Sequence, residues 1–576
     1  MIRTILLGLA ATLAFAAQDS PGDYSFSGTV VNSVTGAPVK GAEVTLVALS
    51  NVEAGAGSPA KGAEVTAVVL TNGEAGAGAP PDRPGPMVAV FSTGAGGEYL
   101  FSGLAAGLYM LNAVKPGFVP AGGGREPMEC IAVSASVSGH TIRLAPFGAI
   151  DGKLSNQYGD PLAGAAIVLF ERYVEDGVRS VRMRSGAVTD DRGEFRVWDL
   201  PPGRYYVQAR REGEATSLQV GDRSVRYSPW EGFHPVFFGG AHNMDSATPV
   251  EVTAGGQARA DFDITMEPTY KVRGTLRNFV PGQPVVFDWL ESGTDAVARG
   301  VVQAAVLDEK TGKFELDGVP GGQYTLRAVQ GHDARAETAV TVKDGDVNGV
   351  AMTLIPAVPV TGRVRPAGAA QESRAAPLAE GAMEPAQPAP ANCFVSLEPS
   401  SSEPCYGCVG RRAEDGEFFI AGVFPGQYRF RAQCTNGYVV SAVSGGADLL
   451  ANPEIAVPAG AAIPPIEIAV KAGGGSLRAR LAVSSAPPGT GMLLARASAP
   501  STGPVFQAAF PAPSPTGEPE YEFGNLAPGD YLAYAFSDLQ SVEYRSPGFL
   551  DALTGGTGVH IEDGKTTVVT LTSLVK

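Results

Sequence analysis

Four cysteines close together in the chain are the residues best suited to form covalent or metal bonds. They are Cys393, Cys405, Cys408 and Cys434, whereas the fifth, Cys130, stands far upstream. An exported protein meets oxidising surroundings, so this grouping favours two disulfides. Zinc is the alternative, because Cys405 and Cys408 have the spacing of a zinc knuckle, although the other two form no second close pair. The pattern leaves the connectivity open and predicts that Cys130 is buried or free.

A stretch rich in aromatic residues could bind a ligand without covalent chemistry. Residues 227–242 read YSPWEGFHPVFFGGAH and follow several arginines. Rings beside arginines can stack on sugar faces or grip a peptide or polyanion. The candidate ligand-binding residues are Tyr227, Trp230, Phe238, Arg223 and Arg226. The favoured alternative is that the rings pack over one end of a domain or against a neighbouring one. Residues 544–550 form a smaller analogue.

No combination of residues predicts catalysis, a cofactor or a bound metal. The chain has five histidines, and none has the His-Glu-x-x-His or His-x-x-Glu spacing of a zinc site. A Gly-x-Ser-x-Gly nucleophile elbow is also missing from the sequence. The acidic segments 190–193 and 344–346 lack the ligand run of a calcium loop, so we expect hairpin turns there. The sequence therefore predicts a protein that is not an enzyme.

These residues are set in a pattern that occurs five times. One copy, residues 416–432, reads GEFFIAGVFPGQYRFRA. Its alternation of apolar and polar residues predicts two strands. The Pro-Gly pairs between the strands, such as Pro202-Gly203 and Pro425-Gly426, predict a type II turn with glycine at positive φ. Two residues after the turn glycine, each copy has a tyrosine that we expect at the core edge, its hydroxyl bonded to nearby backbone. These tyrosines are Tyr109, Tyr205, Tyr324, Tyr428 and Tyr531.

The first two copies carry a further motif upstream. Residues 36–46 read GAPVKGAEVTL, and residues 159–169 read GDPLAGAAIVL. Together with the later Asp-x-x-Gly-x-Phe and Pro-Gly-x-Tyr patterns, this resembles the carboxypeptidase regulatory-like domain, a transthyretin-like β-sandwich found in tandem in bacterial envelope proteins. The resemblance covers the first two copies well, the third and fourth mainly in their second halves, and the fifth more loosely. It implies a fold and no activity.

A chain of 576 residues is too long for a single core. Its 74 glycines and 45 prolines suit many short strands and turns better than helices. We therefore expect an all-β protein of five tandem Ig-like or transthyretin-like β-sandwich domains after an N-terminal signal peptide. The predicted divisions are a signal peptide at 1–17 and repeats one to five at 18–146, 147–268, 269–356, 357–471 and 472–576.

Two of the predicted repeats contain insertions. In repeat one, residues 40–60 are followed at once by a near copy of themselves, residues 61–81. One copy is surplus to an ordinary sandwich, and the addition is either a tolerated insertion, which we favour, or an extended presentation loop. In repeat four, residues 366–391 are rich in alanine, proline and glutamate, which predicts a disordered loop.

The start of the chain and its net charge bear on location and partners. A charged start followed by the apolar run at residues 5–16 is typical of a secretory signal, and the run is too short to span a membrane. We therefore expect export to the periplasm, the cell surface or the extracellular space. The net charge of -16 opposes binding to nucleic acid or anionic lipid.

The combined pattern predicts a structural or adhesive protein of the cell envelope. Its expected partner is an envelope protein or a polysaccharide. One alternative is a carbohydrate-binding protein that uses the aromatic stretch. Another is an accessory subunit of an outer-membrane transporter or hydrolase.

Overall fold

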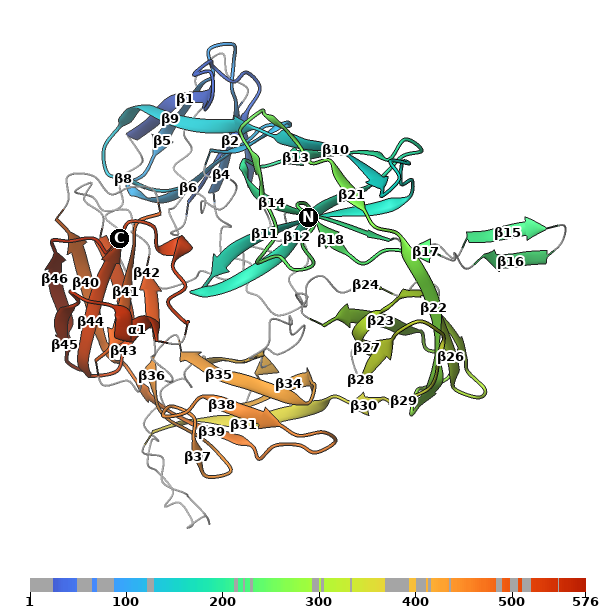
Figure 1. Cartoon of the computed structure of the whole chain (residues 1–576). Coiled ribbons are helices and arrows are strands. Elements are labelled where there is room, and N and C mark those ends of the chain that lie inside the picture. The colour runs from blue at the N-terminus through green and yellow to red at the C-terminus, as the bar shows by residue number, and fades with distance from the viewer. Residues whose placement is uncertain are drawn as a thin grey trace.

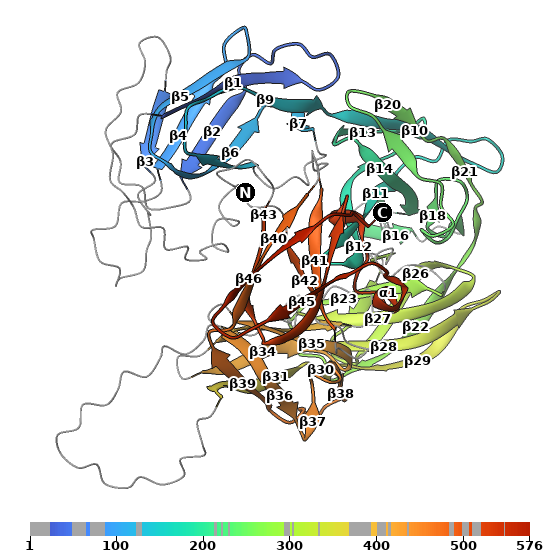
Figure 2. The same cartoon turned by 90° about the vertical axis from the view of Figure 1, so that its left-hand side faces the viewer.

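In the computed structural model the chain is built almost entirely of β-strands. Figure 1 shows groups of sheets that follow one another around the molecule, from repeat one in blue to repeat five in red, and Figure 2 shows them from the side. The structure describes residues 24–48, 65–69, 87–121, 129–211, 216–220, 223–227, 231–292, 300–301, 305–331, 334–367, 393–399, 411–412, 416–434, 437–482, 489–497, 506–509, 520–546 and 548–575. The predicted signal peptide and nearly all of the predicted disordered loop lie outside these residues.

Repeat one forms two sheets, with strand orders β5-β1-β9-β7 and β3-β4-β2-β6-β8. Its strands are β1 (Tyr24–Asn32), β2 (Glu43–Ala48), β3 (Val65–Val69), β4 (Met87–Ser92), β5 (Glu98–Leu104), β6 (Gly107–Val114), β7 (Phe118–Pro120), β8 (Glu129–Val133) and β9 (Val137–Pro146).

Repeat two forms the sheets β13-β10-β20 and β12-β11-β14-β18, and a separate hairpin β15-β16. Its strands are β10 (Gly148–Asn156), β11 (Ala165–Glu175), β12 (Val178–Val188), β13 (Glu194–Leu200), β14 (Gly203–Arg211), β15 (Thr216–Val220), β16 (Arg223–Tyr227), β17 (Glu231–Gly232), β18 (Val236–Phe237), β19 (Val250–Val252), β20 (Gln257–Arg259) and β21 (Phe262–Ile264).

Repeat three forms β17-β22-β26-β25 and β24-β23-β27-β28-β30, so its first sheet takes in one strand from repeat two. Its own strands are β22 (Glu267–Arg277), β23 (Val285–Glu291), β24 (Gly300–Val301), β25 (Ala305–Asp308), β26 (Lys313–Pro320), β27 (Gly322–Gln330), β28 (Ala334–Val342), β29 (Val347–Thr353) and β30 (Ile355–Pro356). Strand β22 runs across the predicted boundary at residue 268.

Repeat four forms β33-β34-β31-β39-β36-β37 and β32-β35-β38. Its strands are β31 (Val358–Pro366), β32 (Cys393–Pro399), β33 (Arg411–Arg412), β34 (Glu417–Val423), β35 (Gly426–Cys434), β36 (Gly437–Ser444), β37 (Ala447–Asp448), β38 (Glu454–Val457) and β39 (Ile466–Ala472).

Repeat five forms β43-β40-β46 and β42-β41-β44-β45. Its elements are β40 (Gly475–Leu481), β41 (Gly491–Arg496), β42 (Phe506–Ala509), β43 (Glu520–Leu526), β44 (Gly529–Phe536), the 3-10 helix η2 (Leu539–Ser541), α1 (Phe549–Ala552), β45 (Thr557–Ile561) and β46 (Thr566–Leu571).

One pairing pattern recurs in all five repeats. The first long strand pairs antiparallel with the first motif strand and parallel with a closing strand, as β1 does with β5 and β9. Buried apolar side chains form a separate cluster between the sheets of each repeat. The predicted all-β sandwich fold is confirmed. These clusters span residues 26–144, 150–264, 272–354, 358–470 and 477–571.

The repeated motif confirms one expectation and corrects another. In every copy the motif tyrosine donates to the backbone oxygen four residues before it, for example Tyr205 to Pro201 at 2.7 Å. The predicted type II turn is wrong at Gly203 and Gly426, whose φ lies outside the left-handed region. Positive φ occurs four residues earlier, at Asp199 and Gly422, because a β-bulge in the first motif strand absorbs the change of direction there.

The duplicated segment of repeat one gives two copies of one strand. Strand β2 comes from the first copy and β3 from the second, and both pair with β4. Val44 of the first copy and the equivalent Val65 of the second both lie opposite Phe91, so the two strands flank β4 in the same register. The second copy therefore extends the sheet by an edge strand.

Candidate functional site

The candidate ligand-binding residues of repeat two are spread over different elements. Arg223, Arg226 and Tyr227 lie in β16, which forms the two-stranded sheet with β15 (Figure 1). Trp230 lies outside the described residues. Phe238 follows β18 and is half-buried, with its ring 5.9 Å from that of Phe262 in an edge arrangement. A ligand-binding role for these five residues stays a prediction.

The described part of the aromatic stretch joins repeat two to repeat three. Strand β17 pairs with β22 and so extends the first sheet of repeat three. Phe237 is fully buried and packs 6.0 Å from the ring of Phe170 inside repeat two. The stretch therefore contacts both repeats. This agrees with the alternative in which its rings pack against a domain.

His234 lies where these two repeats meet. Its side chain is 11% exposed, with Nδ1 3.1 Å from a carboxylate oxygen of Glu291 and Nε2 3.4 Å from one of Glu267. The imidazole lies parallel to the ring of Tyr324 with centroids 6.4 Å apart, and edge-on to His242 at 6.0 Å. The contact with Glu291 raises the pKa of His234, and burial opposes that rise without cancelling it. This cluster, the histidine joint, is a titratable contact between neighbouring repeats.

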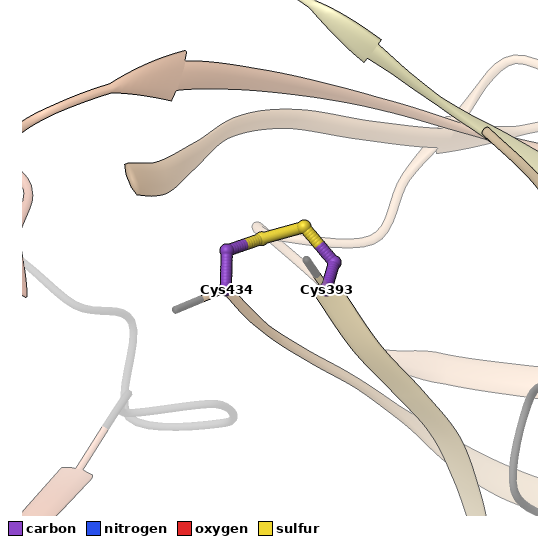
Figure 3. The surroundings of a disulfide bond; sticks show 2 residues. All are labelled: Cys393 and Cys434. Atoms are coloured by element: carbon purple, nitrogen blue, oxygen red, sulfur yellow. A yellow bond between two sulfur atoms is a disulfide. The ribbon is translucent and has the colours of Figure 1, made fainter. Parts of the chain in front are cut away.

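Two of the four grouped cysteines are joined by a disulfide. Cys393 and Cys434 lie directly opposite each other on the paired strands β32 and β35, and their sulfurs are bonded (Figure 3). Cys405 and Cys408 lie outside the described residues, so a second disulfide stays a prediction. The confirmed bridge fastens the first strand of that sheet to the second motif strand of repeat four.

A second contact joins repeats that are not neighbours in the chain. The hairpin of β11 and β12 turns at Asp176 and Gly177, both at positive φ, and its tip reaches repeat four and repeat five. The Asp176 carboxylate accepts from Tyr544 Oη at 2.7 Å and pairs with Arg545 Nη2 at 2.8 Å. Arg431 of repeat four adds its Nη2 at 2.6 Å. We call this contact the aspartate junction.

Backbone and ring contacts reinforce the aspartate junction. The Arg545 amide donates to the Gly177 carbonyl oxygen at 3.0 Å, and Arg179 on β12 pairs with Glu543 at 2.8 Å. The ring of Tyr544 lies so close over the turn that a Cβ on Gly177 would come within 2.5 Å of it. Glycine is therefore required twice at this position, by its φ of 75° and by the ring.

The charges of the aspartate junction compensate one another. Burial raises the pKa of the Asp176 carboxyl, but the guanidinium groups of Arg545 and Arg431 outweigh it and hold that pKa below its ordinary value. Arg431 also pairs with Glu398 at 2.5 Å, so it bridges two carboxylates. Burial, and then the bond to Asp176, raise the pKa of the Tyr544 phenol, which therefore stays protonated and donates.

Sequence patterns gave little warning of the aspartate junction. The sequence patterns did not single out Asp176 or Gly177, and the stretch at 544–550 is the part of the junction that they did indicate. The hairpin turns predicted at the two acidic segments are wrong, because residues 190–193 connect β12 to β13 and residues 344–346 connect β28 to β29, and each pair of strands lies in two different sheets. Asp190 accepts from the backbone amides of Arg192 and Glu194 within its own turn, whereas Asp346 accepts from that of the distant Lys271.

The residues that the structure describes contain neither a metal-binding cluster nor a membrane-spanning helix. Within these ranges, no group of three or more His, Cys, Asp or Glu side chains is arranged to hold a metal ion. Among the same residues, none of the helices has the length and apolar character needed to cross a membrane.

Several solved structures are similar to this chain at low identity. The minor pilin GBS52 of Streptococcus agalactiae is 16% identical, with 45% of this chain and 100% of that chain covered and a TM-score of 0.22. For the shaft pilin SpaA of Lactobacillus rhamnosus GG these values are 10%, 46%, 100% and 0.19. For the TIE protein of Bacillus anthracis they are 11%, 79%, 76% and 0.16. Such TM-scores describe no common overall arrangement.

Comparison with sequences gives a narrower and clearer result. No curated protein matches the chain. The family model of the carboxypeptidase regulatory-like domain matches residues 149–267, from β10 to the start of β22. The matched segment contains both sheets of repeat two and the hairpin that carries Asp176. Residues 149–267 are therefore similar to the carboxypeptidase regulatory-like domain, as the sequence motifs predicted.

Proposed function

We propose that this protein is a non-enzymatic, exported structural protein whose β-sandwich repeats are held in one defined arrangement and bind a protein or a glycan of the cell envelope. The observation that carries the proposal is the aspartate junction. Domains in tandem usually move relative to one another unless their interface is large. Here a hairpin of repeat two is fastened to repeats four and five, which restricts that motion.

Contacts between neighbouring repeats support the same role. Strand β17 and the histidine joint connect repeats two and three. Between repeats three and four, Arg335 lies over the Phe424 ring at 4.6 Å. Between repeats four and five, Lys471 pairs with Asp563 at 2.7 Å. A protein that only needed a flexible tether would have no use for contacts at successive joints.

The aspartate junction is a network of charged and hydrogen-bonded groups, whereas the contacts between neighbouring repeats named above are single pairs. Isolated exposed ion pairs contribute about 0–1 kcal/mol, whereas networks with well-placed guanidinium groups contribute more. The Arg545 side chain is 11% exposed, and Tyr544 is buried. The Asp176 side chain is 45% exposed, so screening by water is reduced on the side of Arg545 and Tyr544 but not removed.

Small-angle X-ray scattering of the whole mature chain tests the proposal. Asp176→Arg places a third cation beside Arg431 and Arg545, so repulsion replaces attraction. The wild-type profile should fit the arrangement in which repeat two contacts repeats four and five. The variant should show a larger radius of gyration with unchanged circular dichroism. Asp191→Arg, an equal charge reversal at an exposed turn of the same repeat, is the matched control and should scatter like wild type.

The outcome separates a fixed body from a flexible chain. A wild-type profile that requires an ensemble of extended conformers would overturn the fixed arrangement. Binding in the envelope is tested by crosslinking in native cells, followed by identification of the captured proteins or glycans. Capture of the chain in the cytoplasm alone would contradict export.

A further inference from the structure

All five repeats bend their first motif strand at the same β-bulge. The bulge places two residues opposite one of the neighbouring strand, as Trp198 and Asp199 lie between the paired residues Val197 and Leu200. Its second residue has positive φ in every repeat. These second residues are Gly103, Asp199, Gly318, Gly422 and Asn525. Bulges re-aim side chains and are frequent beside functional sites.

Repeat two differs from the others at the first bulge residue. The other four repeats have a small or acidic residue there, and repeat two has tryptophan. These residues are Ser102, Trp198, Asp317, Ala421 and Gly524. The Trp198 side chain is 66% exposed. Single exposed apolar side chains are common on protein surfaces, so exposure alone does not mark a binding surface. Trp198 is informative because it is a large ring placed at the bulge, where a strand re-aims its side chains.

By strand register, polar side chains share the face of sheet β13-β10-β20 that carries Trp198. Beside the bulge, the central strand contributes the short side chain of Ala149, and β20 contributes the exposed Gln257. In the next row, Arg196 of β13, Asp151 of β10 and Arg259 of β20 lie side by side in register. We call Trp198, Arg196, Asp151, Gln257 and Arg259 the tryptophan face.

The tryptophan face has two arginines and one aspartate, and the neighbouring Asp261 balances the remaining positive charge. Arg196 Nη1 pairs with Asp151 Oδ1 at 2.8 Å, and Arg259 Nε with Asp261 Oδ2 at 2.6 Å. Arg196 is 53% exposed and Arg259 69%, so both keep donors free to face water. The face thus offers one flat ring, several donors and several acceptors, with little net charge.

We propose that the tryptophan face binds a neutral polysaccharide, with one pyranose ring stacked on the Trp198 indole. The flat, apolar faces of a sugar ring match the indole, and its hydroxyls both donate and accept, as the surrounding Arg, Asp and Gln side chains do. A protein partner would be expected to cover several adjacent apolar side chains, but here one ring stands among polar ones. A polyanion finds no excess of positive charge on this face.

This proposal names a ligand class and a site for the binding part of the proposed function, on which it rests. Its site differs from the aromatic stretch at 227–242, because Trp198 lies on a different sheet from β18, which the stretch contributes. Trp198 is also far in sequence from the aspartate junction residues of repeats four and five. Loss of binding and opening of the arrangement are therefore separate measurements.

Affinity electrophoresis and titration with soluble hexasaccharides of glucose, N-acetylglucosamine and mannose test the proposal on the whole mature chain. Wild type should bind at least one probe, and Trp198→Ala should weaken that binding about tenfold or more, as loss of a central aromatic contact does. The melting temperature should stay unchanged, because the ring is exposed. Tyr158→Ala removes another exposed aromatic of the same repeat and should leave binding unchanged.

A second measurement needs no variant. N-bromosuccinimide oxidises exposed indoles, and peptide mass spectrometry reports which tryptophan reacts. A bound hexasaccharide should protect Trp198 from oxidation. Absence of binding to all three probes overturns the proposal, as does binding that survives Trp198→Ala or leaves Trp198 unprotected. Binding abolished by Trp230→Ala and untouched by Trp198→Ala would move the site to the aromatic stretch and equally overturn it.

Discussion

Repeat two meets other repeats in two places that are built from different chemistry. At the histidine joint, the neighbouring repeat three presents carboxylates to one buried imidazole, which can lose its proton near neutral pH. At the aspartate junction, the distant repeats four and five present two guanidinium groups and a phenol, which keep their protons across the physiological range. The contact between repeats that do not follow one another in the chain is thus the one whose cations keep their charge across the physiological pH range.

The difference follows from what each contact opposes. Repeats two and three are continuous in sequence, and β17 already lies in the sheet of repeat three, so their joint closes little additional chain. The aspartate junction brings together residues 368 or more positions apart where Asp176 meets Tyr544 and Arg545. Closing a longer loop costs more chain entropy, and stronger contacts offset it.

Tyr544→Ala should have the largest effect. The ring is 3% exposed and belongs to a buried cluster with Leu539 and Phe536, and its hydroxyl donates to Asp176. Losing a buried aromatic ring should lower the free energy of unfolding of repeat five by about 4 kcal/mol. Urea denaturation of the whole chain measures this loss. Tyr158→Ala, at an 80% exposed ring, is the control and should change stability by less than about 0.5 kcal/mol. Equal losses in both variants would contradict the buried role.

Loss of the Cys393–Cys434 disulfide should rank second. Cys434 ends β35, the strand that also carries Arg431 of the aspartate junction. The two cysteines are 41 residues apart, and opening a loop of this size should cost repeat four about 3–4 kcal/mol. Denaturation with and without dithiothreitol measures it, and the double variant Cys393→Ala, Cys434→Ala is the control that should no longer lose this part.

The same protein answers the question of the remaining cysteines. Thiol counting on denatured, unreduced chain should find only Cys130 free, because Cys405 and Cys408 are expected to form a second disulfide. Two further free thiols, or stoichiometric zinc in the purified protein, would refute that second disulfide.

The sequence predicts the repeated parts of the fold, because each depends on residues that are close together in the chain. The alternation around Phe195 and Tyr205 predicts strands, and the tyrosine bond to Pro201 follows from a geometry shared by all copies. The position of positive φ was misplaced, since a proline and glycine in succession favour a turn but also fit an extended strand start. In repeat two the bulge residue with positive φ is Asp199, so no glycine marks the position in the sequence.

Contacts between repeats were beyond local reasoning. Asp176 and Arg431 come together only because five sandwiches are oriented in a certain way, and no periodicity encodes orientation. The aromatic density of residues 227–242 did indicate an unusual segment. The two interpretations of this segment, ligand binding and packing, differ in whether its aromatic rings are buried. That burial depends on the neighbouring repeat, so the sequence of the segment does not indicate it.

The histidine joint should make stability depend on pH, with a smaller effect. Because the folded pKa of His234 is raised, its contribution is fully present below the unfolded value of about 6.5 and is lost as pH rises through the folded pKa. Thermal melting from pH 5.5 to 8.5 should show a decline of about 1 kcal/mol or less, the scale of one ion pair. His234→Gln should flatten this dependence, while Asp176→Asn should leave it in place. A rise in stability over this range that requires His234 would refute the sign.

Deletion of residues 61–81 should have the smallest effect, because repeat one contributes to neither contact. The deletion removes β3, an edge strand whose one strand partner is β4, and it leaves β2 with the buried Val44 and Leu46. We expect the free energy of unfolding of repeat one to fall by about 1 kcal/mol or less, within the range of surface changes.

The chain supplies its own matched control for this deletion. Removing residues 40–60 instead lets the second copy take the place of β2, with the same length and nearly the same sequence, but with Ala67 where Leu46 stood. Since Leu46 is 2% exposed in the core, this second deletion should cost about 2 kcal/mol more than the first. Urea denaturation of the two deletions, each with the same number of residues, measures the difference. Equal stabilities would show that either copy can serve as the core strand. A loss of cooperative melting in the first deletion would show that both copies are needed to complete the sheet.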